Sequence, residues 1–397
     1  MESISPPALL DGLSEAERRA LLSDAGLARL QAVFAVVPDP RARRGRRYDL
    51  PFLLTCLVAA LLCNCNTLAA VGQWCQEHRA LLAGRYPYAR HHTPTGALFR
   101  WLLPRLRVAE LEWGLAAWVR ATQSVREHEP LALDGKTVRG AAVVGPDGIR
   151  EAPHLLSVSG HRSRATLLQV RVAGKTNEIP VAQAILPYLP VRGRVVTADA
   201  LHTQTAFAQG VLDQGGDYLL CVKGNQPTLP ADIALAFADP ATRCGPRTTT
   251  TDRCRGRTEV RSLRTTTDLN AYLTVLPQVR QVAELIRTTT NSQGSHREVV
   301  FLATSCSPRQ ASHDQLLTWI RGHWTVEARH FVRDVTFGED RSSLRGGHAP
   351  QIMATLRNLC CTLIYRLGTT AIAATRRTFA YHPATALTLL LPKVRRA

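Results

Sequence analysis

Acidic side chains gather between positions 320 and 340, in the stretch IRGHWTVEARHFVRDVTFGED. They are Glu327, Asp334, Glu339 and Asp340. The chain around them is strongly basic, because 49 Lys and Arg stand against 31 Asp and Glu and the formal net charge is +18. A carboxylate buried without a partner is costly, and a metal ion or a cationic side chain relieves that cost. These acids are therefore the first candidates for a metal site.

The spacing in this stretch predicts a helix with one largely apolar face. Five positions follow an i, i+4, i+7 pattern along that face: Ile320, Trp324, Glu327, Phe331 and Asp334. On such a face the carboxylate of Glu327 can point into a cavity floored by a sheet. The alternative is that Glu327 is a solvated or salt-bridged acid on an amphipathic helix. Residues earlier in the chain help to distinguish these two possibilities.

Strand-like and helix-like patterns alternate through the central part of the chain. The strand-like runs are LALDGKTVRGA, HLLSVSG, TLLQVRVAG, RVVTADALH and DYLLCVKGN, and the helix-like runs are EIPVAQAILPYL and TQTAFAQGVLDQGG. Three strands followed by helix, strand, helix and strand is the order of a ribonuclease-H-like α/β domain. We therefore expect an α/β fold, a mixed sheet flanked by helices. That fold needs one more helix packed on the sheet.

The missing helix comes only after a long interruption. Residues 226–310 contain the strand-like runs EVRSLRTTT, QVAELIRTTT and REVVFLATS, whose threonines favour strands over helix, so we expect a β-rich insertion there. The deferred helix is predicted to start near Ser312 and to carry Glu327. A long amphipathic helix, APQIMATLRNLCCTLIYRLG, follows it.

Two aspartates end strand-like runs in the predicted sheet. Asp134 ends the first strand and Asp199 the fourth, and in a ribonuclease-H-like fold these strands are central neighbours whose carboxyl ends meet at one edge. Glu327 reaches the same edge from the helix. Three carboxylates without a serine or cysteine nucleophile suit divalent ions with oxygen ligands, so we expect Mg²⁺ or Mn²⁺. Two such ions, about 3.5–4 Å apart, support phosphoryl transfer and offset the repulsion between acids and phosphates.

The N-terminal part predicts an all-helical, basic domain over residues 1–128, with short amphipathic helices in residues 8–36. Its loop PDPRARRGRRY either grips phosphate or is simply solvated. The arginines of that loop are Arg41, Arg43, Arg44, Arg46 and Arg47. The expected organisation after this domain is a catalytic core at 129–225, the insertion at 226–310, completion of the core at 311–370 and a basic tail at 371–397.

Composition narrows the class of protein. Hydrophobic residues make up 45% of the chain and charged residues 20%, which is typical of a globular protein, and the excess of arginine favours a nucleic-acid partner. The N-terminus lacks the pattern of a secretory signal, and the apolar run from Leu50 to Cys63 is too short to cross a bilayer. We expect a cytoplasmic protein whose ten cysteines are mostly reduced core residues; a structural zinc site is the alternative.

Four motifs carry a resemblance to a known family: LALDGKTVRGA, VVTADALHTQ, DYLLCVKGNQPTL and RGHWTVEARHFVRDVTFGED. They resemble the H-repeat-associated transposases of bacterial insertion sequences (the ISAs group), which are DDE transposases with a ribonuclease-H-like core. The resemblance implies that Asp134, Asp199 and Glu327 are the catalytic, metal-binding acids. The wider superfamily has Tyr-x2-Arg-x3-Glu-x6-Lys around the last acid. Here only Glu327 matches that pattern, and the HW-x-(Ile/Val)-Glu context supports the assignment.

Several neighbours of the acids are candidates for supporting roles. Lys136 and Arg139 either contact phosphate or form salt bridges. His202 either orients a metal-bound water or caps the following helix, and Trp324 either stacks on a base or packs in the core. DNA-backbone contact is expected at the end of the fifth strand, from Lys223, Asn225 and Gln226. Glu339 or Asp340 is the alternative to Glu327 as third ligand.

The expected function is that of a cut-and-paste DNA transposase of a mobile insertion sequence. Its N-terminal domain would bind the terminal inverted repeats in double-stranded DNA, and its core would cleave the ends and transfer them to target DNA. The resemblance implies a homodimer in the synaptic complex, and we expect the protein at the bacterial nucleoid. The alternatives are a decayed or recruited transposase that only binds DNA, and a ribonuclease-H-like nuclease without strand transfer.

Overall fold

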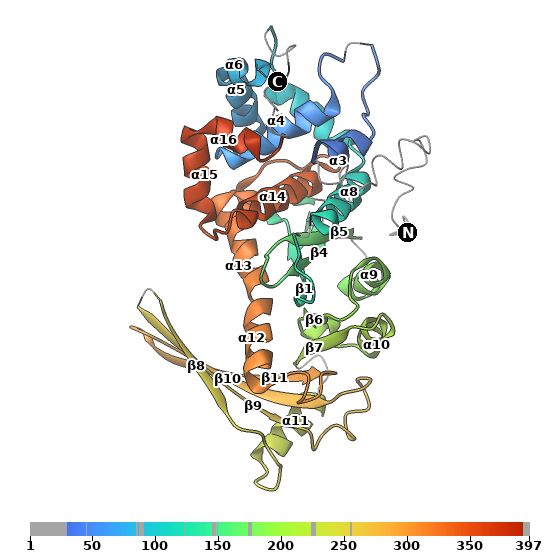
Figure 1. Ribbon diagram of the computed structural model, residues 1–397, viewed down its shortest axis with the longest axis vertical. Coiled ribbons are helices and arrows are strands. Elements are labelled where there is room, and N and C mark those ends of the chain that lie inside the picture. The colour runs from blue at the N-terminus through green and yellow to red at the C-terminus, as the bar shows by residue number, and fades with distance from the viewer. Residues whose placement is uncertain are drawn as a thin grey trace. The chain divides into compact units, whose positions relative to one another are not determined.

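The computed structural model describes residues 30–44, 46–84, 86, 91–122, 124–144, 148, 150–173, 177–223, 228–254 and 256–391 (Figure 1). The predicted helices before residue 30 lie outside this part, as do Asn225 and Gln226. The chain folds into two compact units. The first comprises Met1–Glu127, Gly135–Lys175 and Glu327–Ala397, and the second comprises His128–Asp134 and Thr176–Val326.

The N-terminal part of the first unit is helical in the residues that are described. Its helices are α3 (Leu30–Val36), α4 (Leu50–Leu62), α5 (Leu68–Glu77), α6 (Arg79–Ala83), α7 (Gly96–Leu102) and α8 (Val108–Ala121). Helix α4, LPFLLTCLVAALL, is buried on all sides, because nearly every residue is apolar. Asp49 caps it by accepting a hydrogen bond from the backbone N–H of Phe52 at 2.8 Å.

The remainder of the first unit combines hairpins with C-terminal helices. Its elements are β2 (Val143–Val144), β3 (Arg150–Glu151), β4 (His154–Gly160), β5 (Thr166–Val172), α13 (Thr325–Phe331), α14 (Ala349–Arg366), α15 (Ile372–Tyr381) and α16 (Pro383–Thr388). Helix α14 packs against α4, α8 and β5, and α15 and α16 pack against α4. The segment predicted as a tail is therefore largely helical up to residue 388.

The second unit is built on a mixed sheet with the strand order β1-β6-β7-β11-β10-β9-β8. The strands are β1 (Leu131–Thr137), β6 (Val195–Ala198), β7 (Asp217–Val222), β8 (Thr248–Cys254), β9 (Arg257–Thr266), β10 (Gln281–Asn291) and β11 (Gly294–Thr304). Strands β1, β6 and β7 pair in parallel, and the pairings from β7 through β11 to β8 are antiparallel. Figure 1 shows helices α9 (Glu178–Ile185) and α10 (Thr205–Asp213) on one side of β6 and β7, and α12 (His313–His323) on the other.

This architecture confirms the expected fold class at the level of a mixed α/β protein with a large mixed sheet flanked by helices. The predicted strand at 154–160 and the predicted helix start at Ser312 are also confirmed, since Ser312 accepts a hydrogen bond from Gln315 N as the N-cap of α12. Residues 226–310 contain α11 (Thr228–Ala238) and four strands. Strand β11 pairs with β7, so this segment extends the sheet.

The prediction of one continuous helix through Glu327 is wrong. Helix α12 ends at His323 with Trp324 as its C-cap, α13 follows, and residues 332–336 form a π-helical turn. Gly322 weakens the last turn of α12, and the Thr325 hydroxyl donates to the Gly322 carbonyl at 2.7 Å. The predicted apolar face breaks with the helix, because Ile320 is 1% exposed and Phe331 is 65% exposed.

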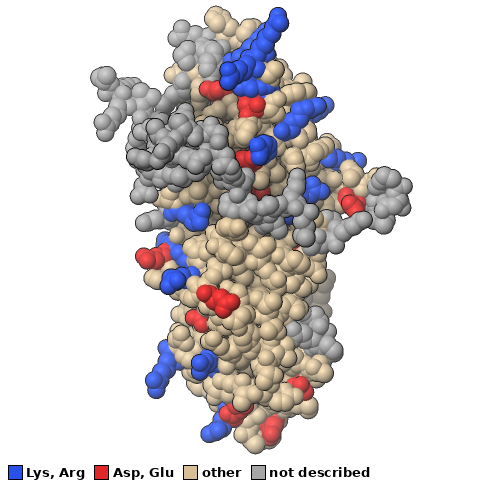
Figure 2. Space-filling view, turned by 90° about the vertical axis from the view of Figure 1, so that its right-hand side faces the viewer, with Lys and Arg blue, Asp and Glu red and all other residues tan. Residues whose placement is uncertain are grey.

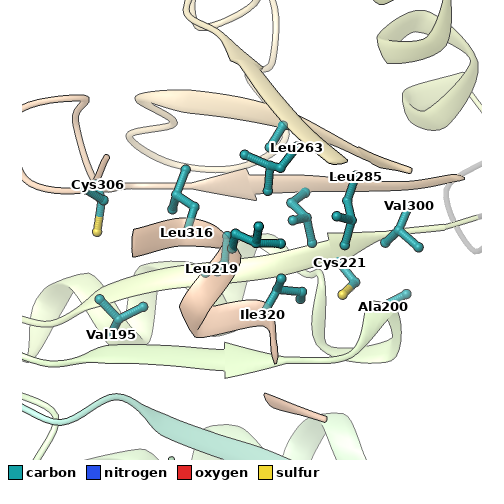
Figure 3. Packing of buried hydrophobic residues seen from close by; sticks show 14 residues of the cluster. Val195, Ala200, Leu219, Cys221, Leu263, Leu285, Val300, Cys306, Leu316 and Ile320 are labelled. Atoms are coloured by element: carbon teal, nitrogen blue, oxygen red, sulfur yellow. The ribbon is translucent and has the colours of Figure 1, made fainter. Parts of the chain in front are cut away.

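Helix α12 is held on the sheet by an apolar core. Figure 3 shows Leu316 and Ile320 of this helix against Leu219, Leu263 and Leu285 of the strands, and all of these side chains are buried. Burying one such side chain contributes roughly 1.5–3 kcal/mol relative to leaving it exposed. This core therefore fixes which face of the sheet α12 covers.

Candidate active site

The two predicted aspartates follow directly on paired positions of adjacent parallel strands. In the β1–β6 ladder Leu131 pairs with Val196 and Leu133 with Ala198, so Asp134 and Asp199 come next in the same register. Neighbouring strands lie about 4.8 Å apart. The carboxyl end of the β1–β6 ladder therefore brings these two acids, which are 65 positions apart in the chain, side by side. The prediction that Asp134 ends its strand is wrong, because β1 continues to Thr137 after its pairing with β6 stops.

Local contacts orient the Asp199 carboxylate. Asp199 is the N-cap of the short 3-10 helix at Ala200–His202, and its Oδ1 accepts a hydrogen bond from Leu201 N at 3.1 Å. The side chain is exposed, whereas Asp134 is half-buried. An exposed carboxylate with one oxygen held by the backbone keeps its other oxygen available to a ligand.

The alternation of side chains along β6 shows which face the acids share. Residues two apart on a strand point to the same face, so Asp199 lies on the face of Thr197, and Asp134 on that of Ala132. The Thr197 hydroxyl donates to Leu131 O at 3.3 Å and is 3.0 Å from Nδ1 of His323, at the end of α12. The two aspartates therefore belong to the face that α12 covers.

His323 is a neutral anchor for this contact. Burial, and secondarily the nearby His202, lowers the pKa of His323 to about 4. A neutral ring with one N–H can donate to the Thr197 hydroxyl, which itself donates to a backbone carbonyl. The end of α12 is thus joined to β6 two residues before Asp199.

Glu327 lies on α13, four residues after His323, and is exposed. It is the first residue of the last segment of the first unit, while Asp134 and Asp199 belong to the second. Four residues of chain span at most about 14 Å. Within the described residues, no group of three or more His, Cys, Asp or Glu side chains gathers as a metal-ligand cluster. The joint metal site of the three acids remains a prediction.

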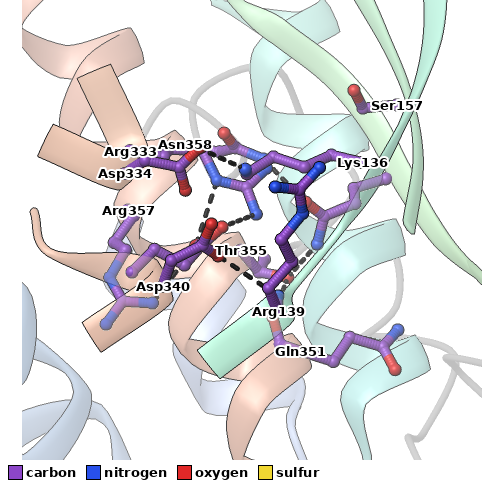
Figure 4. Close-up of polar contacts among 12 residues, drawn as sticks. Lys136, Arg139, Ser157, Arg333, Asp334, Asp340, Gln351, Thr355, Arg357 and Asn358 are labelled. Carbon is purple, nitrogen blue, oxygen red and sulfur yellow. Dashed lines mark hydrogen bonds and ion pairs between the residues drawn. The ribbon is translucent and has the colours of Figure 1, made fainter. Parts of the chain in front are cut away.

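Lys136 is engaged by a protein partner. Its ammonium lies 2.6 Å from Oδ2 of Asp334, and the lysine side chain is 8% exposed (Figure 4). This corresponds to the salt-bridge alternative, but the pair is more buried than expected. The ammonium of Lys136 is therefore committed to Asp334 and is not available to phosphate. Arg139 is exposed, and its backbone N–H donates to Asp340 Oδ1 at 3.1 Å.

Glu339 is held in a buried ion-pair cluster, which argues against its role as third ligand. Arg333 donates to Oε1 at 2.6 Å and to Oε2 at 3.1 Å, and Arg357 donates to Oε2 at 3.1 Å. Burial acts to raise the pKa of Glu339, but the two guanidinium charges outweigh it and hold the pKa below its usual value. Both carboxylate oxygens are occupied.

The other candidates for supporting roles, His202, Trp324 and Lys223, differ in how deeply they are buried. His202 is fully buried, with Nε2 3.0 Å from Glu178 Oε2, and the N-cap of the following helix α10 is Gln204. A role of His202 in orienting a metal-bound water stays a prediction. Trp324 packs against the α12 core, and the guanidinium groups of Arg261 and Arg287 lie 5.6 and 5.0 Å from its ring centre. This arrangement corresponds to the core-packing alternative. Lys223, which follows β7, is exposed.

The arginines of the loop at residues 38–48 differ in their contacts. Arg41 pairs with Asp39 at 2.7 Å and donates to Tyr48 O, and Arg46 donates to backbone carbonyls of the same loop. These two arginines shape the loop. Arg43, Arg44 and Arg47 are exposed, as is Arg46. Figure 2 shows Lys and Arg side chains projecting at several places on the face that it draws.

A buried carboxyl group in the first unit escaped the sequence analysis. Glu112 of α8 accepts hydrogen bonds from Gln169, Gln351 and Thr355 at 2.9–3.1 Å. Burial raises its pKa to about 7, although the three hydrogen bonds oppose the rise. Its sequence context, VAELEWGLAAWV, resembles an ordinary amphipathic helix, and only the tertiary fold brings the amides to it.

Glu112 should make the stability of the protein depend on pH. A raised folded-state pKa means that the native state binds more protons, so stability is full below pH about 4.5 and is lost as pH rises through 7, by roughly 3 kcal/mol. Glu112→Gln should remove this slope. The free energy of urea unfolding, measured for both proteins from pH 5 to about 8, tests it. Exposed Glu77→Gln is the control, and parallel curves for wild type and Glu112→Gln would contradict the prediction.

Comparisons with known proteins agree with the resemblance. A model of the family described as "Transposase DDE domain" matches residues 127–363, and one described as "DDE_Tnp_1-associated" matches residues 31–119. The chain is 24% identical to "Putative transposase YncI" of Escherichia coli O157:H7, over 83% of this chain and 85% of that protein. It is 23% identical to "H repeat-associated putative transposase YhhI" of Escherichia coli K12, over 85% and 90%.

A third relative is more similar over a shorter length. It is "Uncharacterized protein in dhlA 3'region" of Xanthobacter autotrophicus, 33% identical over 53% of this chain and 70% of that protein. The described helices include none with the length and apolarity needed to cross a membrane. Because the DDE-domain match extends over more than half of the sequence, the chain belongs to the transposase DDE domain family.

Proposed function

We propose that this protein is a cut-and-paste DNA transposase, which cleaves the ends of an insertion sequence and joins them to target DNA. The observation that carries the proposal is the register of β1 and β6, which sets Asp134 and Asp199 side by side at the carboxyl edge of a parallel pair. Membership of the DDE family supports the DNA substrate. Open α/β sheets place their sites at this edge.

The core is proposed to be ribonuclease-H-like, with Glu327 as the third acid. Parallel strands β1, β6 and β7, with helices on both faces, support this fold. The contact of His323 with Thr197 anchors α12 on the face of the two aspartates, and Glu327 follows four residues later. The short connection between His323 and Glu327 supports the proposal that the Glu327 carboxylate lies near the two aspartates.

The donor set fits Mg²⁺ or Mn²⁺, because carboxylate oxygens are the ligands that hard divalent ions prefer. Asp134, Asp199 and Glu327 would hold two such ions, and Leu201 N–H keeps the Asp199 carboxylate oriented. When bound, the ions activate the attacking oxygen and stabilise the leaving oxygen in phosphoryl transfer. Hydrolysis adds water across one P–O bond and frees a 3′-hydroxyl, and joining exchanges one phosphodiester bond for another.

DNA contact is proposed for exposed basic side chains and for the end of β7. The residues are Arg43, Arg44, Arg47, Arg139, Lys223, Asn225 and Gln226. Exposed arginines bind phosphate bidentately and release counterions. We further propose that the N-terminal helices bind the terminal inverted repeats, that two copies pair the ends in a synaptic homodimer, and that the protein works in the cytoplasm at the nucleoid.

The test is an assay that separates cutting from joining. Labelled duplexes from the DNA that borders the coding sequence are incubated with supercoiled target DNA and Mg²⁺, and pre-cleaved ends are offered in parallel. The proposal expects cleaved ends with free 3′-hydroxyls and, from either substrate, products joined to the target. EDTA is the control and should abolish both.

Two other outcomes would each replace the proposal. Released ends without joined product, even from pre-cleaved substrate, would identify a ribonuclease-H-like nuclease. Specific binding of the end duplexes without cleavage would identify a recruited or decayed transposase that holds DNA.

A further inference from the structure

A hollow of about 690 Å³ lies within the first unit, and its lining includes none of Asp134, Asp199 and Glu327. Its lining includes three arginines and several small polar side chains: Asn66, Thr67, Arg100, Arg341, Ser342 and Arg345. None of the residues that line it is acidic. The hollow therefore concentrates positive charge.

The three arginines are available to a ligand. Arg100, Arg341 and Arg345 are all exposed, and none of them forms an ion pair with another described residue. This differs from Arg333 and Arg357 nearby in the chain, whose charges are paired with Glu339. Guanidinium groups that share a hollow repel one another, and an anion that binds among them removes that repulsion.

A close crossing of two helices places Arg100 at the hollow. At Gly72 of α5 an added Cβ would lie 2.4 Å from Gly96 N, and at Gly96 it would lie 2.6 Å from Leu68 O. Only glycine at both positions permits the backbones of α5 and α7 to approach this closely. Arg100 is in the last turn of α7, so the crossing sets it beside the start of α5.

The segment that carries the other two arginines is held in place. The segment begins at Gly338, whose φ is +61°. The next residue, Glu339, accepts hydrogen bonds from Arg333 and Arg357. It ends at Gly347, with φ +49°, where an added Cβ would lie 2.5 Å from Pro104 O. Because both ends are fixed, Arg341 and Arg345 are presented from a shaped loop.

Two helices begin at the hollow and add to its attraction for anions. The lining residues 66–69 include the start of α5 at Leu68, and the lining residues Gly346 and Ala349 lead into and begin α14. His348, the N-cap of α14, makes no side-chain capping bond. Helix N-termini carry partial positive charge, which favours phosphate.

We propose that this hollow, defined by Arg100, Arg341 and Arg345, docks the phosphate backbone of DNA. The inference rests on the proposed function for its choice of ligand. The volume far exceeds that of one small anion, since a water molecule occupies about 30 Å³ of liquid. Three arginines around one hollow suit successive phosphates of a strand.

The test measures DNA binding without catalysis. The variant Arg100→Gln, Arg341→Gln, Arg345→Gln is compared with wild type on the end duplex in EDTA, by fluorescence anisotropy between about 50 and 200 mM salt. Each phosphate contact contributes about 0.9 to the slope of log Kd against log salt, so the slope should fall by roughly 2–3. At about 0.1 M salt, binding should weaken on the order of 10²-fold.

The matched control removes the same charge elsewhere on the first unit, as Arg79→Gln, Arg171→Gln, Arg377→Gln, all exposed. It should keep the wild-type slope. Equal slopes for the two triple variants would overturn the inference. A second result would also overturn the inference. If the Arg100→Gln, Arg341→Gln, Arg345→Gln variant binds DNA like wild type but is no longer stabilised against heat by inorganic phosphate, the hollow is a site for a free anion. Binding in EDTA does not require cleavage, so this result stands apart from the cutting and joining assay.

Discussion

Asp199→Asn is expected to lower Mg²⁺-dependent cleavage of the end duplex by about 10³-fold or more while the protein stays folded. The amide removes the negative charge that a hard divalent ion requires. It keeps the cap, because an asparagine Oδ1 can still accept the hydrogen bond from Leu201 N and asparagine caps as well as aspartate. Initial rates on labelled duplex, with circular dichroism for folding, measure the effect.

The control for this prediction is Asp213→Asn. Asp213 is an exposed aspartate on α10, which Figure 1 shows on the side of the sheet opposite α12. It should cleave at the wild-type rate. Asp134→Asn should behave like Asp199→Asn, because the ladder puts the two acids in one register. If either variant retains cleavage within tenfold of wild type, that aspartate has no part in the mechanism.

Glu339→Gln should destabilise the protein by about 3–5 kcal/mol, the typical result of removing one partner from a buried ion pair. The side chains of Glu339, Arg333 and Arg357 are 0–1% exposed, so the substitution leaves two guanidinium charges buried without a counterion. At roughly 2–4 °C per kcal/mol, Tm should fall by about 10 °C. Urea unfolding and thermal unfolding both measure this change.

An exposed pair provides the comparison for Glu339. Glu298 lies 3.6 Å from Arg287 and is 41% exposed, so Glu298→Gln should change stability by less than about 1 kcal/mol. Replacing the whole buried cluster, as Arg333→Met, Glu339→Leu, Arg357→Met, should recover most of the loss, since no charge is then left unpaired. If Glu339→Gln lowers stability no more than Glu298→Gln does, the buried cluster of Arg333, Glu339 and Arg357 does not hold the loop at residues 338–347 in place.

Local patterns were sufficient to predict most elements of the sheet. The apolar runs at 154–160 and 217–225 correspond to β4 and β7, and the helix start at Ser312 follows from its capping side chain. Such features depend on residues close together in the chain, so a single sequence contains them. The presence of an aspartate directly after the apolar residues of β1 and of β6 is information of the same kind.

Side-chain partners that are distant in the chain could not be predicted in this way. Lys136 is paired with Asp334, 198 positions away, and Glu112 meets Gln351 from 239 positions away. Neither pairing leaves a local signal, because each depends on how helices pack. The break at Trp324 was missed because the spacing pattern ignored Gly322 and Thr325, whose local contact ends the helix.

The sequence by itself determined the acids, the alternation of strands and helices, and the basic charge of the chain. Only the tertiary structure decided that β1 and β6 are in register at Asp134 and Asp199, that Glu339 is committed to two arginines, and that three arginines from separate segments surround one hollow. The physical reason is that periodicity and capping act over a few residues, whereas strand register and charge pairing are settled when remote segments pack together.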